Sequence, residues 1–124
     1  MPSPRQLLTI DAIGAAVTSA LTALVLAPGH LPTGLPSPAL HTLAAVAAAF
    51  CLLGVAALLT RRDPFHTLGW LALANASYCL ATAALCLIHW PTLTGWAILY
   101  FAGEIAIVLT LAAVEWSASS QPRP

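Results

Sequence analysis

Residues 95–116 read GWAILYFAGEIAIVLTLAAVEW, an apolar run whose only charged side chains are Glu104 and Glu115. At about 1.5 Å of rise per residue, an α-helix of this length crosses the roughly 30 Å of hydrocarbon in a bilayer. Further long apolar runs lie at 7–27, 39–60 and 67–89. They are rich in Ala and Leu and do not alternate with a period of two, which is unlike barrel strands. The sequence therefore predicts an all-α protein, with a single transmembrane domain over 1–124 built as a four-transmembrane-helix antiparallel bundle.

The composition is incompatible with a water-facing surface. Hydrophobic residues make up 60% of the 124 residues and charged residues 6%, whereas a soluble domain carries about 25% charged residues. Four basic residues balance four acidic ones, so the chain has no basic stripe with which to bind nucleic acid. These values exclude a soluble enzyme, a nucleic-acid binder and a disordered tail, and they leave the lipid bilayer as the expected surroundings.

The arginines predict the orientation of the bundle. Arg5 precedes the first span, Arg61 and Arg62 lie between the second and third, and Arg123 follows the fourth. The other two connections contain no Lys or Arg. The positive-inside rule then places both termini in the cytoplasm (N-in/C-in) of a multi-pass protein of the cytoplasmic, or inner, cell membrane. The tryptophans agree with this orientation. Trp70 and Trp116 lie near the predicted cytoplasmic interface, and Trp90 and Trp96 lie near the outer interface.

The first apolar run has a second interpretation as a cleavable signal peptide, because Arg5 precedes an apolar stretch that ends at Ala27. Against it, Pro28 would follow the cut and Asp11 interrupts the apolar region, so we expect the first span to remain in the protein. The connection 28–38 is dense in proline and glycine. We expect it to be a stiff connector between spans rather than a binding loop.

Each predicted span carries one polar or small face. Tyr100, Glu104 and Glu115 share a stripe, because steps of four and eleven residues nearly close whole helical turns. The other faces are Asn75, Cys79, Thr82 and Cys86 in the third span, Asp11, Ala15, Thr18 and Thr22 in the first, and Ala45, Ala48 and Ala49 in the second. We expect these faces to close around a polar interior. Small residues also allow two copies to pack, so a homodimer or a membrane partner is a further expectation.

Depth within the spans selects the ligand-binding candidates Asp11, Asn75, Tyr78, Tyr100 and Glu104. Glu104 lies mid-span, where it can reach Asn75 or Tyr78, and Asp11 can approach Asn75 or Glu115 from the cytoplasmic side. We expect Glu115 itself to be solvated at the cytoplasmic interface. An ionisable group inside a span costs about 2.5–3.5 kcal/mol on insertion scales, so it normally faces protein or a wet cavity. The alternative interpretation is that these residues only hydrogen-bond across the bundle and hold it together.

Other chemistries lack their motifs. Cys51, Cys79 and Cys86 form no Cys-x-x-Cys pair and are expected to be small buried hydrophobes. The histidines have no ligand spacing, so we expect no metal, haem or other cofactor. The sequence contains no nucleophile elbow, zinc-protease motif or phosphate-binding glycine loop. Acid catalysis needs only one or two positioned carboxyl groups. Whether the chain is an enzyme therefore stays open, with Glu104 as the candidate acid.

Three short motifs carry a resemblance that runs over most of the chain. They are IDAIGA at 10–15, NASYC at 75–79, and YFAGEI at 100–105 with Glu115 after it. In these the chain resembles a family of uncharacterised small four-span bacterial integral membrane proteins. That family has no known activity, so the resemblance supports the choice of residues and implies no function. Size and span number also match the small multidrug exporters, but those carry a mid-span glutamate in the first span, whereas this chain has Asp11 near the cytoplasmic end.

Three functions fit these observations. In the first, the bundle binds a small apolar or amphipathic molecule within the membrane, with or without transforming it by acid–base chemistry. Alternatively, it is a proton-coupled carrier that acts as an oligomer, because one short bundle scarcely encloses a two-sided pathway. As a third alternative, it is a structural or regulatory subunit of a membrane assembly.

The protonation of Glu104 is the first testable prediction. Hydrocarbon disfavours an ionised carboxyl group, and the sequence places no Lys or Arg deep in any span to offset this. We therefore expect Glu104 to be protonated near neutral pH and to donate a hydrogen bond. A titration followed by difference infrared spectroscopy measures this directly, and an ionised Glu104 at pH 7 would contradict the prediction.

Overall fold

The computed structural model describes residues 3–60 and 63–120, so Arg61, Arg62 and Arg123 lie outside the described residues. Within these ranges the chain is helical and has no strand. The long helices are α1 (Pro4–Leu21), α2 (Ser37–Leu59), α3 (Pro64–Ile88) and α4 (Gly95–Ser119). A π-helical turn, Thr22–Leu26, extends α1. Each of these helical segments is long and apolar enough to cross a membrane, which confirms the predicted all-α, four-helix fold.

Side-chain caps fix where three of the helices begin. The Ser3 hydroxyl accepts a hydrogen bond from the Gln6 amide, and the Gln6 side chain accepts one from the Ser3 amide. The Asp63 side chain accepts from the Phe65 amide at the start of α3, and the Thr94 side chain from the Ala97 amide at the start of α4. Such caps satisfy amide groups that a first helical turn leaves without partners. The segments between the apolar runs thus set the helix boundaries.

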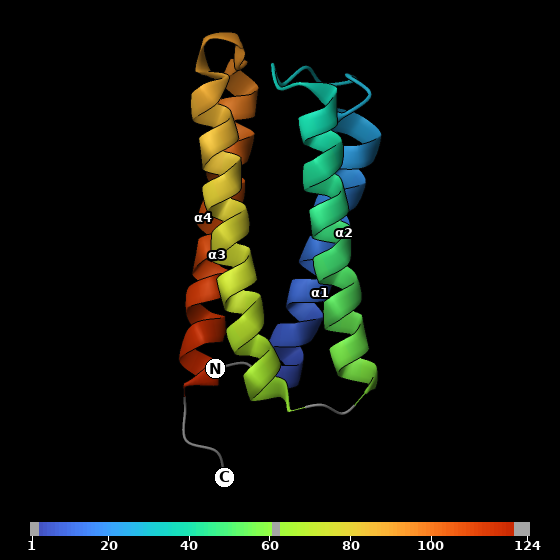
Figure 1. The fold of residues 1–124 in the computed structure, drawn as a ribbon, viewed down its shortest axis with the longest axis vertical. Coiled ribbons are helices and arrows are strands. Elements are labelled where there is room, and N and C mark those ends of the chain that lie inside the picture. The colour runs from blue at the N-terminus through green and yellow to red at the C-terminus, as the bar shows by residue number, and fades with distance from the viewer. Residues whose placement is uncertain (1–2, 61–62, 121–124) are drawn as a thin grey trace.

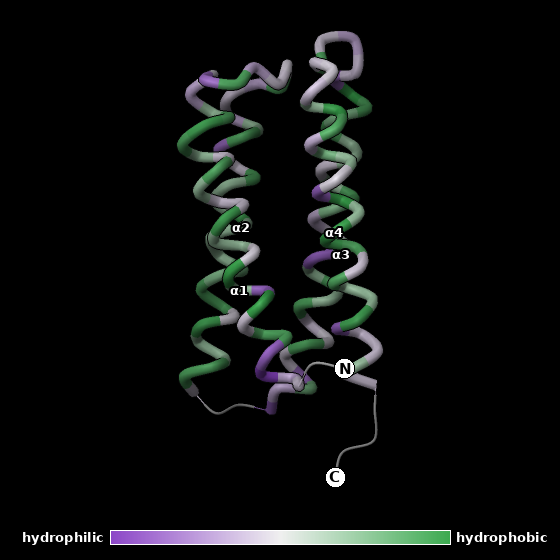
Figure 2. The backbone as a smooth tube through the Cα atoms, turned by 180° about the vertical axis from the view of Figure 1, so that it is seen from behind, coloured by the Kyte–Doolittle hydropathy of each residue, from purple (hydrophilic) through white to green (hydrophobic). Residues whose placement is uncertain are grey.

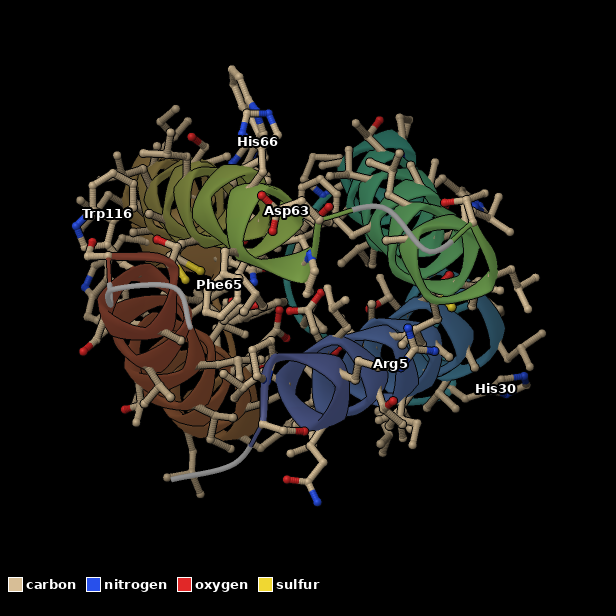
Figure 3. The ribbon with its side chains drawn as sticks, turned by 90° about the horizontal axis from the view of Figure 1, so that it is seen from below. Arg5, His30, Asp63, Phe65, His66 and Trp116 are labelled. Atoms are coloured by element: carbon tan, nitrogen blue, oxygen red, sulfur yellow. The ribbon has the colours of Figure 1, made fainter. Side chains whose placement is uncertain are left out.

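The helices form two hairpins (Figure 1). α1 packs along α2 and α3 packs along α4, whereas contacts between the hairpins are much sparser. Viewed along the bundle, the helices follow one another in chain order, so that α4 neighbours α1 (Figure 3). α1 begins and α4 ends at the same end of the bundle. We call this the inner end, after the predicted orientation, and the opposite end the outer end.

Small residues bring α1 and α2 together. A side chain at Gly54 would place its Cβ atom 3.2 Å from that of Ala12, so glycine is what this crossing accommodates. Ser19 adds a polar contact across the same interface, because its hydroxyl donates to the Ala44 carbonyl oxygen at 2.9 Å. Near the inner end, the Arg5 guanidinium donates to the carbonyl oxygen of Leu58 at 3.0 Å. The first hairpin is therefore joined by close backbone approach and by polar groups.

The predicted inward face of the second span is wrong. Ala45 and Ala49 are exposed, whereas Ala44 and Ala47 are buried. A run of near-uniform alanines has no periodic pattern that selects one face. The tight contact at Gly54 determines instead which face of α2 is buried. Gly54 does not belong to the predicted alanine stripe.

The connection between α1 and α2 reaches across the outer end to the second hairpin. The Pro32 carbonyl oxygen accepts hydrogen bonds from the Trp96 indole at 2.7 Å and the Thr94 hydroxyl at 2.8 Å. The Thr94 amide donates to the Thr33 carbonyl oxygen, and the Thr92 hydroxyl to that of Gly34. We call these contacts the outer clasp. The segment is a connector, as predicted, and it also fastens the two hairpins together.

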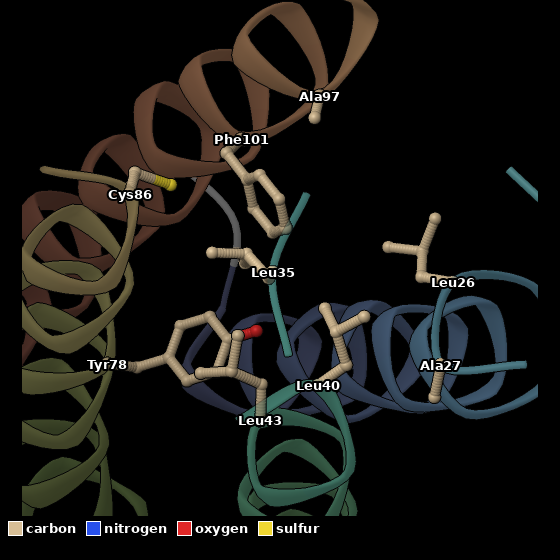
Figure 4. Packing of buried hydrophobic residues seen from close by; sticks show 9 residues of the cluster. All are labelled: Leu26, Ala27, Leu35, Leu40, Leu43, Tyr78, Cys86, Ala97 and Phe101. Carbon is tan, nitrogen blue, oxygen red and sulfur yellow. The ribbon is translucent and has the colours of Figure 1, made fainter. Parts of the chain in front are cut away.

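Buried apolar side chains of the described residues form a cluster near each end of the bundle. In the outer cluster, Leu35 of the connection packs with Leu43 of α2, Tyr78 of α3 and Phe101 of α4 (Figure 4). The inner cluster joins all four helices through Leu7, Leu8, Ala57, Leu68, Leu71 and Ala118. The region between the two clusters holds the polar residues described below.

Hydrophobic residues run along the length of the four helices (Figure 2), and many of the large ones are exposed. Leu59, Leu80 and Leu99 each expose more than 70% of their area. Trp116 points outward near the inner end, as does His66 (Figure 3). A bilayer covers such a surface without cost, which is the expected pattern for an integral membrane protein.

At Gly34 the outer clasp leaves no room for a side chain. Its φ angle is +86°, and a Cβ atom there would collide with the Thr92 carbonyl group. Gly29 has nearly the same angle, +85°, with nothing within 4 Å of an added Cβ. We expect Gly29→Ala to cost about 1 kcal/mol of folding free energy through its backbone angle alone, and Gly34→Ala to cost clearly more. Unfolding in mixed detergent micelles measures both, and equal losses would contradict a specific role for the clasp.

Candidate functional site

Asn75 joins three helices in the inner half of the bundle. Its side-chain nitrogen donates one hydrogen bond to Asp11 Oδ1 of α1 and another to Glu115 Oε1 of α4, both at 2.8 Å. Asn75, Asp11 and Glu115 are 6%, 3% and 0% exposed. We call these three residues the Asn75 bridge. Both hydrogens of the amide are used, so one side chain of α3 links the second hairpin to the first.

The expectation that Glu115 is solvated is wrong, because its side chain is fully buried. The last turns of α4 pack into the bundle, and Ala112 and Ala118 are buried on the same side. The signal for this was present in the sequence, since Glu115 shares a helical stripe with Glu104. Nearness to the predicted interface does not outweigh that periodicity, because the last turns of α4 stay packed in the bundle.

A cavity of about 410 Å³ lies between the hairpins. It is lined by all five candidates selected from the sequence, Asp11, Asn75, Tyr78, Tyr100 and Glu104. Most of the remaining wall is apolar and includes Phe50 of α2 and Leu111 of α4. Its volume falls within the range of about 300–1,000 Å³ that is usual for small-molecule sites. The geometry thus brings the five candidates together around one space.

Glu104 is an acidic residue of this cavity wall. Both of its carboxyl oxygens are buried and have no hydrogen-bond partner among the described residues. The hydroxyl groups of Tyr78 and Tyr100 lie beside the carboxyl group without completing a hydrogen bond to it. Buried polar groups without partners are uncommon and usually await a water molecule or a ligand. Glu104 therefore has unused hydrogen-bonding capacity in the cavity wall.

The two tyrosine rings are held by aromatic neighbours. The Tyr100 ring lies edge-to-face against Trp96 and Phe101, with centroids 6.1 and 5.2 Å away. The Tyr78 ring packs edge-to-face on Phe50 of α2 at 6.3 Å. Edge-to-face contacts of this kind are favourable and restrict ring rotation. The hydroxyl groups beside Glu104 are consequently fixed in place by packing.

The cavity opens to the outside between α1 and α4. Gly14 and Gly103 line it from these helices, both are exposed, and an added Cβ at either would meet nothing within 4 Å. Leu99 and Ile107 flank the opening and are 77% and 71% exposed. Because the outward surface is apolar, this opening faces lipid in a bilayer. Gly14 and Gly103 thus leave this part of the cavity wall without side chains.

Other reactive groups lie apart from one another. Cys51, Cys79 and Cys86 are free thiols, and the last two are buried as expected for small apolar side chains. Across residues 3–60 and 63–120, no three His, Cys, Asp or Glu side chains come together as metal ligands do. The polar chemistry of the described chain is thus concentrated in Glu104 with its tyrosines and in the Asn75 bridge.

Comparison with models of known protein families, with curated proteins and with solved structures finds no match. The resemblance noted from the sequence motifs therefore stays a prediction. Functional inference for this chain depends on the geometry of its own residues.

The Asn75 bridge makes a direct prediction about stability. Asn75→Leu keeps the side-chain volume close to that of Asn but removes two hydrogen bonds to carboxyl groups, each worth about 1.5–3 kcal/mol. We expect a loss of about 3 kcal/mol or more in unfolding free energy. The control Ser77→Ala changes an exposed residue of α3 that bonds only to its own helix at Leu73, and should alter stability by less than about 0.5 kcal/mol. Similar losses in both variants would contradict a bridging role for Asn75.

Proposed function

We propose that this small integral membrane protein binds a small, largely apolar molecule carrying one polar group in the cavity between its hairpins. In this proposal the protein lies in the cytoplasmic membrane with both termini inside. Glu104 contacts the polar group, and the apolar wall covers the rest of the molecule. The observation that carries the proposal is Glu104, a residue of the wall of a cavity of ligand size whose two carboxyl oxygens are buried and unpartnered.

The chemistry of the wall defines the kind of molecule. An apolar lining provides affinity through surface burial, and a few polar groups at fixed positions determine orientation. A protonated Glu104 donates one hydrogen bond and accepts another, while Tyr78 and Tyr100 each add a donor. A ligand with a carbonyl, hydroxyl or amine group at one end satisfies these partners.

The route of entry follows from the two glycines. Gly14 and Gly103 leave space between α1 and α4, so a molecule dissolved in lipid can enter sideways without crossing the polar ends of the bundle. This favours a ligand that partitions into the membrane. If the ligand is also transformed, Glu104 is the residue placed to protonate it.

Native mass spectrometry of protein extracted gently from its own membrane tests the proposal. We expect wild type to retain a small-molecule mass, and Gly103→Leu to lose it because a leucine side chain blocks the entrance. Glu104→Gln removes the carboxyl group and should lower occupancy. Thr110→Ala is the matched control on α4, because Thr110 is exposed and its hydroxyl bonds only to Ala106 of its own helix.

The outcomes separate the alternatives. A mass retained equally in all four proteins would show binding outside this cavity and would overturn the proposal. Protein that is free of small molecules in every sample would do the same. Higher-order masses of the chain would then favour an oligomeric carrier, and a co-purifying protein would favour a membrane subunit.

A further inference from the structure

We propose that Asp11 and Glu115 share a single proton, and that this proton-binding site holds the two hairpins together in the inner half of the bundle. The site is distinct from Glu104, and the inference does not depend on the proposed ligand. It assigns a bound species to the pair of carboxyl groups that the Asn75 bridge brings together from α1 and α4.

The first argument is the balance of donors and acceptors. Asn75 supplies two N–H groups, and these satisfy one oxygen of each carboxyl group. The remaining oxygens, Asp11 Oδ2 and Glu115 Oε2, are buried and lack a partner among the described residues. Two carboxylates are acceptors only, so nothing described within the bridge can satisfy these oxygens unless a proton is present.

The second argument is that the two acids are held close together, because Asp11 Oδ1 and Glu115 Oε1 each lie 2.8 Å from the same Asn75 nitrogen. A hydrogen bond between two carboxyl groups requires a hydrogen, which only a protonated one carries. One proton is enough, because the protonated acid donates and the ionised acid accepts. Pairs of carboxyl groups that share a buried site behave in this manner, since both cannot readily ionise together.

The third argument is the charge of the surroundings. Among the described residues Arg5 is the basic side chain on α1, and its guanidinium is directed to the end of α2 at Leu58. His66 of α3 is exposed and pairs with Trp70. The titratable groups that share the cavity wall with Asp11 are Glu104 and two tyrosines, and the wall residues from α2, Ala47 and Phe50, carry no charge. No described cation therefore balances a second negative charge, whereas a proton does.

The amide group also argues against a metal ion in place of the proton. Asn75 directs its nitrogen, with both hydrogens, at the carboxyl oxygens. A cation bound between these oxygens would meet N–H groups where it needs oxygen ligands. A proton between the free oxygens leaves the amide bonds undisturbed.

Loss of this proton has a structural consequence. Two negative charges would then face each other across the interface between α1 and α4, where the hairpins share few contacts. Separation of the hairpins would let water solvate both groups. Asp11 and Asn75 also line the cavity, so release of the proton would open the inner side of that cavity.

Infrared difference titration of the full chain in lipid vesicles tests the shared proton. In a Glu104→Gln background, Asp11 and Glu115 are the carboxyl groups that remain within the predicted spans. We expect the carbonyl band of one protonated carboxyl group per chain at pH 7. Asp11→Asn should remove the band, because an amide N–H takes the place of the proton and Glu115 stays ionised. Glu115→Gln makes the same replacement from the other side and serves if the first variant does not fold.

Two infrared results would overturn the proposal. One is the absence of a protonated carboxyl band at pH 7 in the Glu104→Gln background. The other is a band of undiminished intensity in both Asp11→Asn and Glu115→Gln, which would show that the proton is not shared. A titration that shifts when sodium replaces potassium would assign the site to a metal cation instead, and would equally contradict the proposal.

The dependence of thermal stability on pH gives an independent readout. If the folded pair holds a proton that the separated acids of the unfolded chain release, the folded state binds more protons and stability falls as pH rises. We expect the melting temperature of wild type in detergent to fall as the proton is released. Asp11→Asn carries its donor permanently and should lack this part of the fall, whereas Thr110→Ala should retain it. An identical pH dependence in wild type and Asp11→Asn would refute a structural role for the proton.

Discussion

The contact between the two hairpins depends on the polar groups buried between them. In a bilayer, lipid chains are as apolar as leucine, so burial of apolar surface adds little to the association of helices. Hydrogen bonds between helices, together with close packing, must supply what the hydrophobic effect does not. Asn75 makes two such bonds from one side chain, to a residue on α1 and a residue on α4. The relative placement of the hairpins in the inner half follows from that one amide group.

The remaining architecture divides the bundle along its length. The outer clasp ties the hairpins where Pro32 meets Thr94 and Trp96, and an apolar cluster lies near each end. The hairpins share few contacts, and the cavity lies between them. Fixed ends and an open middle are the conditions under which a four-helix bundle can hold a guest molecule without losing its fold.

Much of this arrangement could be predicted from the sequence, and the exceptions have physical causes. Run length and hydropathy determine the four helices, and helical periodicity is sufficient to bring Asp11, Asn75 and Glu104 to one interior. The inward face of α2 was not predictable because alanine lines several of its sides, so the contact at Gly54 decides its rotation. The outer clasp was missed because it depends on backbone carbonyl groups, which leave no pattern in the side chains.

The burial of Glu115 changes how the acidic residues of the interior are grouped. With Glu115 solvated, Asp11 and Glu104 would be two separate acids, each with its own neighbours. With Glu115 inside, Asp11 belongs to a pair bridged by Asn75, and Glu104 stays alone beside two tyrosine hydroxyls. The paired acids share one amide group and suit a small shared cation such as a proton, whereas the single acid belongs to the cavity wall and suits a larger guest. One cavity wall thus contains two acidic sites whose different neighbours fit them for different occupants.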